Sequence, residues 1–313
     1  MHWRVKGAIQ KVLGRVPGGG QVHYLLQRYA GGLTNFAGEC DTKVEDWRLM
    51  MGHLRTSRLP VSGATLLEMG TGWYPTFPIC LYLAGAARIH TFDLNRHLKP
   101  QMTVALVERL GNHIHTIAEE SGLPSSEIDA RRRALLGALR SGAPISTATG
   151  GAIDYHAPAD AAKTGLAGAS VDVVFSNSVL EHVPGPVIED CLREAHRIIK
   201  PGGIVFHSVN CGDHYAYVDR SISQLHYLKY SETAWKKWNN AFLYQNRLRA
   251  EDFTRMAKKA GFAIEIDTSR PHPTRLKQLD AIEVHPWFSE RYSRDQLAIT
   301  SIDFVGRKAR SAS

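Results

Sequence analysis

Short apolar runs recur along the chain from residue 64 onward and predict the strands of a sheet. Seven such runs lie at 64–69, 87–95, 152–155, 171–177, 204–210, 262–267 and 297–308. Stretches with apolar residues at helical spacing separate most of them, and the clearest lie at 75–86, 186–203 and 250–261. Strands that alternate with helices favour parallel pairing. The pattern therefore predicts an α/β fold with a doubly wound, Rossmann-like sheet.

The first 60 residues have a different pattern, of helices without strands. The glycine-rich stretches PGGG (17–20) and AGG (30–32) interrupt these helices. In VEDWRLMMGHLRTSRLP (44–60), apolar residues recur at helical spacing until Pro60. This predicts an N-terminal helical extension, residues 1–60, that packs over a domain spanning 61–313.

Polar residues follow several of the predicted strands, and ligands of a doubly wound sheet bind outside the carboxyl ends of its strands. The residues in question are Glu68, Gly70, Thr71, Gly72, Asp93, Asp160, Asn177 and His207. They are the candidates for a binding site.

The turn GTGWYP (70–75) looks like a dinucleotide-binding glycine loop whose last glycine is replaced by Pro75. Proline cannot provide the close helix–strand packing of that glycine. Glu68, just before the turn, would repel a pyrophosphate and suits a cationic ligand, whereas Asp93 could accept hydrogen bonds from both hydroxyls of a ribose. The two acids favour S-adenosylmethionine, with an NAD-dependent oxidoreductase as the alternative.

Several segments, in order, resemble the class I S-adenosylmethionine-dependent methyltransferases. LLEMGTGWYPTFPICLYLAGAARIHTFDLN (66–95) resembles their first two motifs, YHAPADA (155–161) the third and VDVVFSNSVLEHV (171–183) the fourth. LREAHRIIKPGGIVFHSVN (192–210) resembles the helix, turn and fifth strand, and the likeness extends over about 64–308. It implies a seven-stranded, mostly parallel sheet with an antiparallel last strand.

The resemblance also implies roles for individual residues. Glu68, Gly70, Thr71 and Gly72 would bind the methionine part of the cofactor, Asp93 the ribose, and Leu94 the adenine face. Asp160 and Ala161 would meet the adenine edge, and Asn177 and Ser178 would lie under the sulfonium. Asp160 could instead be a solvated loop acid, and Asp93 a helix cap.

Two departures from the family pattern stand out. Tyr74 occupies the place of a third glycine and Pro75 follows it, which predicts a reshaped pocket near the methionine carboxylate. The distance from Asp93 to the third strand is about twice the usual one, which predicts a helical insertion at about 101–148. The insertion could cover the site or join two subunits.

The segment from about 210 to 245 follows the fifth strand and is dense in polar and aromatic residues, which predicts a substrate loop. Asp213 and His214 are the favoured catalytic pair, a histidine base with its orienting carboxylate, and His182 and His207 are further candidates. Asp213 could instead cap a structural turn. The segment DHYAYVD, SIS, LKYSE and NRLRAEDF resembles bacterial methyltransferases of polysaccharide and small-molecule pathways. This implies O-methylation of a sugar or another small hydroxyl-bearing acceptor, with RNA or a lipid as alternatives.

Composition adds few constraints. The 313 residues carry a formal charge of +8, and residues 1–38 contain five Lys and Arg but no acid, as Arg4, Lys6, Lys11, Arg15 and Arg28. A second basic run lies at 131–133. These residues indicate either a solvated basic surface or an acidic partner. No RNA-binding module is evident, and no DNA partner is expected. Four scattered cysteines and the absence of HExxH predict no disulfide, no metal and a cytoplasmic location. No run has the length of a transmembrane helix, whereas peripheral membrane contact and a homodimer stay open.

Overall fold

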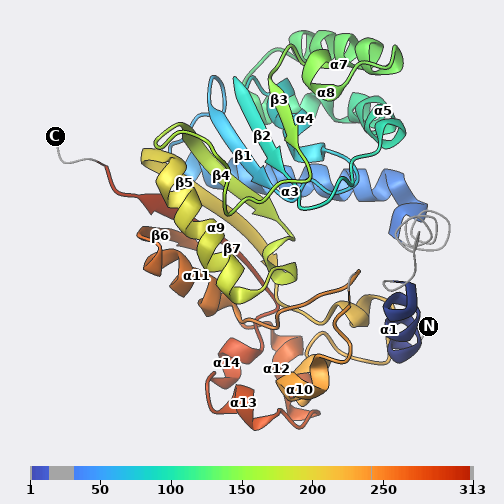
Figure 1. Cartoon of the computed structure of the whole chain (residues 1–313), viewed down its shortest axis with the longest axis vertical. Helices are drawn as coiled ribbons and strands as arrows, with labels where there is room; N and C mark the ends of the chain where they lie inside the picture. Colours follow the sequence, from blue (N-terminus) through green and yellow to red (C-terminus); the bar gives the residue numbers. More distant parts are fainter. Residues whose placement is uncertain (1, 14–31, 241, 311–313) are drawn as a thin grey trace.

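The computed structural model describes residues 2–13, 32–240 and 242–310 (Figure 1). The predicted PGGG break at 17–20, the first two residues of AGG, and Arg15 and Arg28 lie outside the described residues.

Seven strands form a single sheet in the order β3-β2-β1-β4-β5-β7-β6 (Figure 1). Their bounds are Thr65–Met69 (β1), Arg88–Phe92 (β2), Ile153–His156 (β3), Val171–Asn177 (β4), Ile199–Asn210 (β5), Phe262–Asp267 (β6) and Ser301–Lys308 (β7). Neighbours from β3 to β5 pair in parallel, and β7 pairs antiparallel with both β5 and β6. The predicted mostly parallel sheet with an antiparallel last strand is confirmed. The chain order reverses between β1 and β4, which is where such sheets bind ligands.

Helices cover both faces of the sheet (Figure 1). One core cluster joins α3 (Phe36–Thr56) and α4 (Thr76–Leu83) to the sheet, and another joins α9 (Gly185–Ile198) and α11 (Ala250–Lys259) to it. The apolar face of α3 that its spacing predicts is buried, as Val44, Trp47, Met50, Met51 and Leu54. Part of the predicted extension therefore belongs to the same hydrophobic core as the sheet.

Residues 100–148 are mostly helical, with α5 (Pro100–Arg109), η2 (Leu110–His113), α6 (Ile114–Ser121), α7 (Ser125–Arg140) and α8 (Ile145–Ala148). Their apolar residues join the cluster of α3 and α4. Asp41 of α3 accepts hydrogen bonds from Arg109 Nε at 2.9 Å and lies 2.8 Å from His113 Nε2. These contacts attach the insertion to the flank of the sheet.

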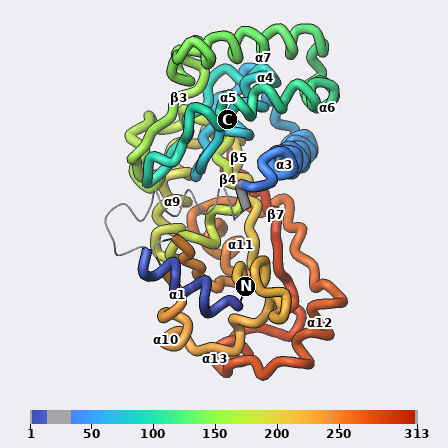
Figure 2. Tube along the Cα trace, turned by 90° about the vertical axis from the view of Figure 1, so that its right-hand side faces the viewer, coloured from blue at the N-terminus to red at the C-terminus, as the bar shows by residue number. Residues whose placement is uncertain are grey.

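A third, aromatic cluster lies beyond the carboxyl end of the sheet. It contains α1 (Trp3–Leu13), η4 (His214–Tyr217), η5 (His226–Lys229), α10 (Glu232–Trp235), α12 (Pro273–Asp280), α13 (Pro286–Ser289) and α14 (Arg294–Leu297). Figures 1 and 2 show α1 beside α10, although the two helices are far apart in the sequence. The Trp3 ring lies 4.6 Å from that of Trp238, centroid to centroid, and its amide donates to Asp219 Oδ2 at 3.0 Å. The first helix is thus docked on the predicted substrate loop.

No helix among the described residues combines the length and the apolar character needed to cross a bilayer.

Candidate functional site

Glycine is favoured at both positions of the turn after β1, but for different structural reasons. Both have positive φ, +81° at Gly70 and +72° at Gly72, where glycine is favoured. A Cβ on Gly70 would lie 2.5 Å from Val179 Cγ2, whereas a Cβ on Gly72 would meet nothing within 4 Å. Gly70 therefore permits close packing inside the protein, and Gly72 borders open space.

Tyr74, which stands at the place of the family's third glycine, has its side chain in the core. Its ring is buried against Phe36 of α3, in an edge-on contact with centroids 5.1 Å apart. Burial also raises the pKa of its hydroxyl. The bulky side chain packs in the core because an apolar surface is available there, and its predicted effect on the shape of the pocket stays a prediction.

Glu68 lies beneath the turn and is 6% exposed. Its Oε2 accepts a hydrogen bond from Thr91 Oγ1 at 2.7 Å, and the Thr91 hydroxyl also contacts that of Thr71. Burial raises the pKa of Glu68 to about 7, against the lowering effect of these threonine hydroxyls. The carboxyl thus connects the turn to β2.

Asp93 follows β2 and reaches the same turn. Its Oδ2 accepts a hydrogen bond from the Gly72 amide at 2.9 Å. Burial raises its pKa to about 6, although the Gly72 and Thr71 amides lower it. The next residue, Leu94, is 66% exposed. A carboxylate next to an exposed apolar side chain suits a ribose with its attached base, because the carboxylate can accept hydrogen bonds from the hydroxyls and the side chain can contact the base.

The third predicted segment lies next to Asp93, because the Ala159 amide donates to the Asp93 carbonyl at 2.8 Å. Asp160 itself is exposed, and its Oδ1 accepts from the Ala162 amide at 2.8 Å. Ala161, between them, packs against the apolar cluster of α9 and α11. Asp160 therefore both caps a turn and lies in the loop adjoining the ribose candidate.

Asn177 and Ser178 end β4. Ser178 has φ +53° and its amide donates to the Ser208 carbonyl of β5 at 2.9 Å. The Asn177 side chain hydrogen-bonds Asp46, a residue of α3 that sequence reasoning missed. Helix α3 thereby contributes a carboxyl at the carboxyl edge of the sheet.

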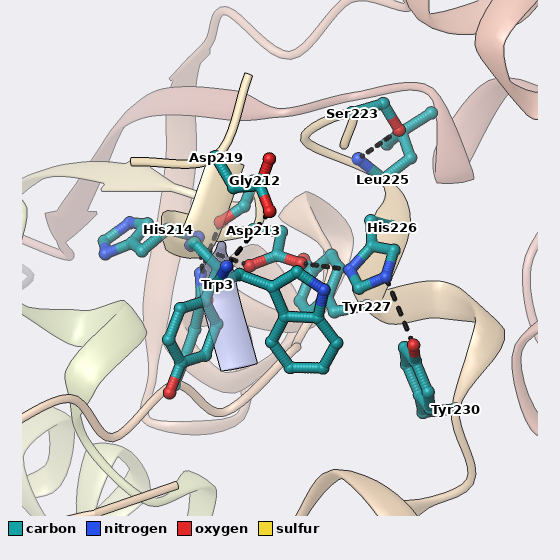
Figure 3. A network of polar contacts seen from close by, with 12 residues as sticks. Trp3, Gly212, Asp213, His214, Asp219, Ser223, Leu225, His226, Tyr227 and Tyr230 are labelled. Carbon is teal, nitrogen blue, oxygen red and sulfur yellow. Dashed lines mark hydrogen bonds and ion pairs between the residues drawn. The ribbon is translucent and has the colours of Figure 1, made fainter. Parts of the chain in front are cut away.

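The predicted pairing of Asp213 with His214 is wrong. Asp213 Oδ2 lies 3.0 Å from His226 Nδ1, and its Oδ1 accepts from the Tyr215 amide at 2.8 Å, which caps η4. Figure 3 shows the Asp213 carboxylate directed at His226 and the His214 ring on the opposite side. Sequence neighbours diverge here because Asp213 is the N-cap and His214 begins the helical turn. The network ends at Tyr230, whose hydroxyl is 3.2 Å from His226 Nε2.

His214 instead meets His182. Their ring centroids lie 4.9 Å apart, edge to face, and the Tyr217 ring is 5.5 Å from that of His214. His182 belongs to η3 (Leu180–His182), directly after β4. Burial lowers the pKa of both histidines, to about 3 for His214, with His182 and Lys6 adding to the effect there. Both rings are therefore neutral near pH 7.

Glu181 completes this group, and sequence reasoning did not single it out. It is 1% exposed, and burial raises its pKa to about 8. Its carbonyl accepts from the Asn246 amide at 3.0 Å, and Asn246 Nδ2 donates to the carbonyls of Leu180 and Val183 at 2.7 and 2.8 Å. Asn246 thus fixes the turn that carries Glu181 and His182.

His207, the remaining candidate base, is buried within the sheet. Its Nδ1 lies 2.7 Å from Ser176 Oγ, and its ring packs against Phe304. Burial lowers its pKa to about 3. Its surroundings are those of a structural histidine.

Comparison with known proteins gives one family match. A family model described as a methyltransferase domain matches residues 45–265, more than half of the chain. Similar solved structures include an S-adenosylmethionine-dependent methyltransferase from Mesorhizobium loti, at 16% identity, with 82% of this chain and 96% of that one covered and a TM-score of 0.44. A putative sarcosine dimethylglycine methyltransferase from Galdieria sulphuraria matches at 14% identity, 86% of each chain and a TM-score of 0.45.

A geranyl diphosphate methyltransferase in complex with S-adenosylmethionine matches at 12% identity, 85% of each chain and a TM-score of 0.46. No curated protein matches the chain. The family model therefore carries the assignment.

Proposed function

The chain belongs to the S-adenosylmethionine-dependent methyltransferase family, and we propose that it methylates a hydroxyl of a sugar or another small acceptor. The observation that carries this proposal is the pair of neutral imidazoles, His182 and His214, whose ring centroids are 4.9 Å apart after β4 and β5. A neutral imidazole can take up the proton that a hydroxyl loses on methylation.

The residues of the turn fit the cofactor. Gly72 borders open space, Asp93 offers a carboxylate for the ribose, and the exposed Leu94 offers an apolar surface for adenine. Asp160 and Ala161 would meet the adenine edge, and Asn177 and Ser178 would face the methyl-bearing centre. When bound, S-adenosylmethionine supplies an already activated methyl group, so the protein has mainly to align and deprotonate the acceptor.

On the acceptor side, we propose His214 as the base, with Nε2 as the atom that takes the proton. Nε2 is buried without a hydrogen-bond partner among the described residues, so no other group of this part of the chain uses its lone pair. The neighbouring Tyr217 ring is 57% exposed and could stack on a sugar ring. The Asp213–His226 pair would act by holding the η4 turn rather than by orienting His214.

The two alternatives predicted from the sequence now differ in their support. The family match sets the NAD-dependent oxidoreductase aside. RNA or a lipid head group as acceptor keeps only the support of the basic residues, which include Lys6 of α1 near His214. The cytoplasmic location, a peripheral membrane contact and a homodimer stay predictions from the sequence.

The test is a screen of hydroxyl-bearing acceptors for release of S-adenosylhomocysteine. We expect turnover with a saccharide or small alcohol, and His214→Ala should lose turnover while keeping cofactor affinity. Turnover confined to RNA or lipid would overturn the acceptor class. Full activity of His214→Ala would overturn the choice of base.

A further inference from the structure

Two buried side-chain atoms beside the His182–His214 contact have no hydrogen-bond partner in the described part of the chain. They are Glu181 Oε2 and His214 Nε2. Native proteins rarely leave such atoms unpaired, and an unseen ion or water is a common reason. Both atoms belong to residues that converge on one point.

The convergence includes His182. One ligand atom each of Glu181, His182 and His214 lies within 4.8 Å of the other two. From this geometry we propose that Glu181, His182 and His214 bind a divalent transition-metal ion. Two imidazoles and a carboxylate, with the remaining positions open, form the donor set of many catalytic zinc and iron sites.

The surroundings of His182 support this assignment. Its Nδ1 lies 2.7 Å from the Tyr244 carbonyl, so Nδ1 carries the proton and the lone pair is on Nε2. A metal-binding histidine characteristically donates its other ring N–H to a carbonyl or carboxylate. Asn246, which holds the turn of Glu181 and His182, provides further rigidity.

Two lysines act against a cation here. The charge of Lys43, on α3, reaches Glu181, and that of Lys6, on α1, reaches His214. They set a limit on the affinity, and Lys6 provides a test, because its replacement by a neutral residue should tighten metal binding. The expectation from the sequence of no metal rested on the absence of HExxH, a spacing within one helix, whereas these ligands come from two distant segments.

A second group, His90, Asp154 and His156, also has its ligand atoms within 4.8 Å of one another. There, however, Asp154 is paired with Arg88, and His90 Nδ1 lies 3.3 Å from His156 Nε2 as a hydrogen bond. In this group Asp154 Oδ2, His90 Nδ1 and His156 Nε2 already have partners. It therefore serves as the internal control.

The experiment is a titration of metal-depleted protein with Co²⁺, followed by visible d–d absorption, without cofactor or acceptor. We expect binding of one equivalent, weakened at least about tenfold by Glu181→Gln and by His182→Ala, and unchanged in His90→Ala. Lys6→Met should bind Co²⁺ more tightly. Thermal unfolding of each variant checks the fold, and two ligand variants are included so that one stays informative.

Absence of Co²⁺ absorption in the wild type would overturn the proposal, as would unchanged binding in both ligand variants or loss of binding in His90→Ala alone. An imidazole nitrogen bound to a metal ion has no lone pair left for a proton, so in the metal-bound protein His214 would be a ligand rather than the base. The ion would then hold the acceptor oxygen and favour the loss of its proton, a role that rests on the proposed function. Because the titration contains neither cofactor nor acceptor, its failure would leave the methyl-transfer proposal standing, and a failed acceptor screen would leave the metal site standing.

Discussion

The Asp93 carboxyl should couple cofactor affinity to pH. Its Oδ2 accepts from the Gly72 amide at 2.9 Å, and burial raises its pKa to about 6. We expect the ionised form to accept two further hydrogen bonds from the ribose hydroxyls. Protonation then weakens binding, so affinity should be constant above the pKa and fall as the pH drops through about 6.

The magnitude follows from the strength of these bonds. A hydrogen bond to a charged group contributes roughly 1.5–3 kcal/mol, about twice that of a neutral one. Protonation of Asp93 halves the contribution of each of the two hydrogen bonds to the ribose. The free energy of binding then falls by roughly 1.5–3 kcal/mol, which corresponds to a roughly 10- to 150-fold rise in Kd. Asp93→Ala should weaken binding at least about tenfold at every pH.

The assay is calorimetric titration with S-adenosylhomocysteine from about pH 5 to about pH 8. Asp93→Asn is the matched variant, since it keeps the shape but cannot ionise, and its affinity should lack the step near pH 6. Glu68→Gln controls for the other raised carboxyl and should keep that step. A flat profile for the wild type, or full affinity in Asp93→Ala, would exclude Asp93 from the ribose site.

Three further predictions concern the turn, the buried acid and the first helix. Gly70→Ala, which would place Cβ 2.5 Å from Val179 Cγ2, should lower the free energy of unfolding by roughly 2–4 kcal/mol, whereas Gly72→Ala should mainly weaken cofactor binding; equal stability losses in urea denaturation would contradict this. The pKa of Glu68 is raised to about 7 in the fold, so its contribution to stability is present below the ordinary value of 4.5 and is lost as pH rises through 7. The free energy of unfolding of Glu68→Gln should therefore rise relative to that of the wild type over that pH range, by up to about 3 kcal/mol. A pH-independent difference between the two proteins would show that ionisation of Glu68 is not the cause. Trp3→Ala should cost about 3–5 kcal/mol by emptying the aromatic cluster, and an unchanged thermal midpoint would show that α1 does not stabilise this part of the fold.

The strands were predictable because each is a short apolar run, and runs of this kind are distinctive when buried between two helical layers. The candidate binding residues at the ends of these strands could then be predicted as well, because parallel strands bring their carboxyl ends together. The helices α12 to α14 were missed. Two of them are four residues long, too short for a helical period to be visible in the sequence.

The acceptor side was harder to predict for a different reason. Asp213 and His214 are adjacent in sequence, but a helix cap directs one carboxylate away from the neighbouring ring. Glu181 lies in the segment 171–183 that resembles the family's fourth motif, but the sequence predicted no role for it. Glu181 stands out in the structure because its Oε2 is buried without a hydrogen-bond partner among the described residues. This burial depends on segments 244–246 and 210–214, which fold over it. Tertiary contacts of this kind are not encoded in local spacing.

The central claim is that methyl transfer to a hydroxyl occurs beside His182 and His214. It is tested most directly by incubating the protein with methyl-labelled S-adenosylmethionine and pooled saccharides and small alcohols, and locating the label by mass spectrometry. We predict one labelled methyl on an oxygen in the wild-type reaction and none with His214→Ala. Label on nitrogen or carbon, or equal labelling by the two proteins, would contradict the account.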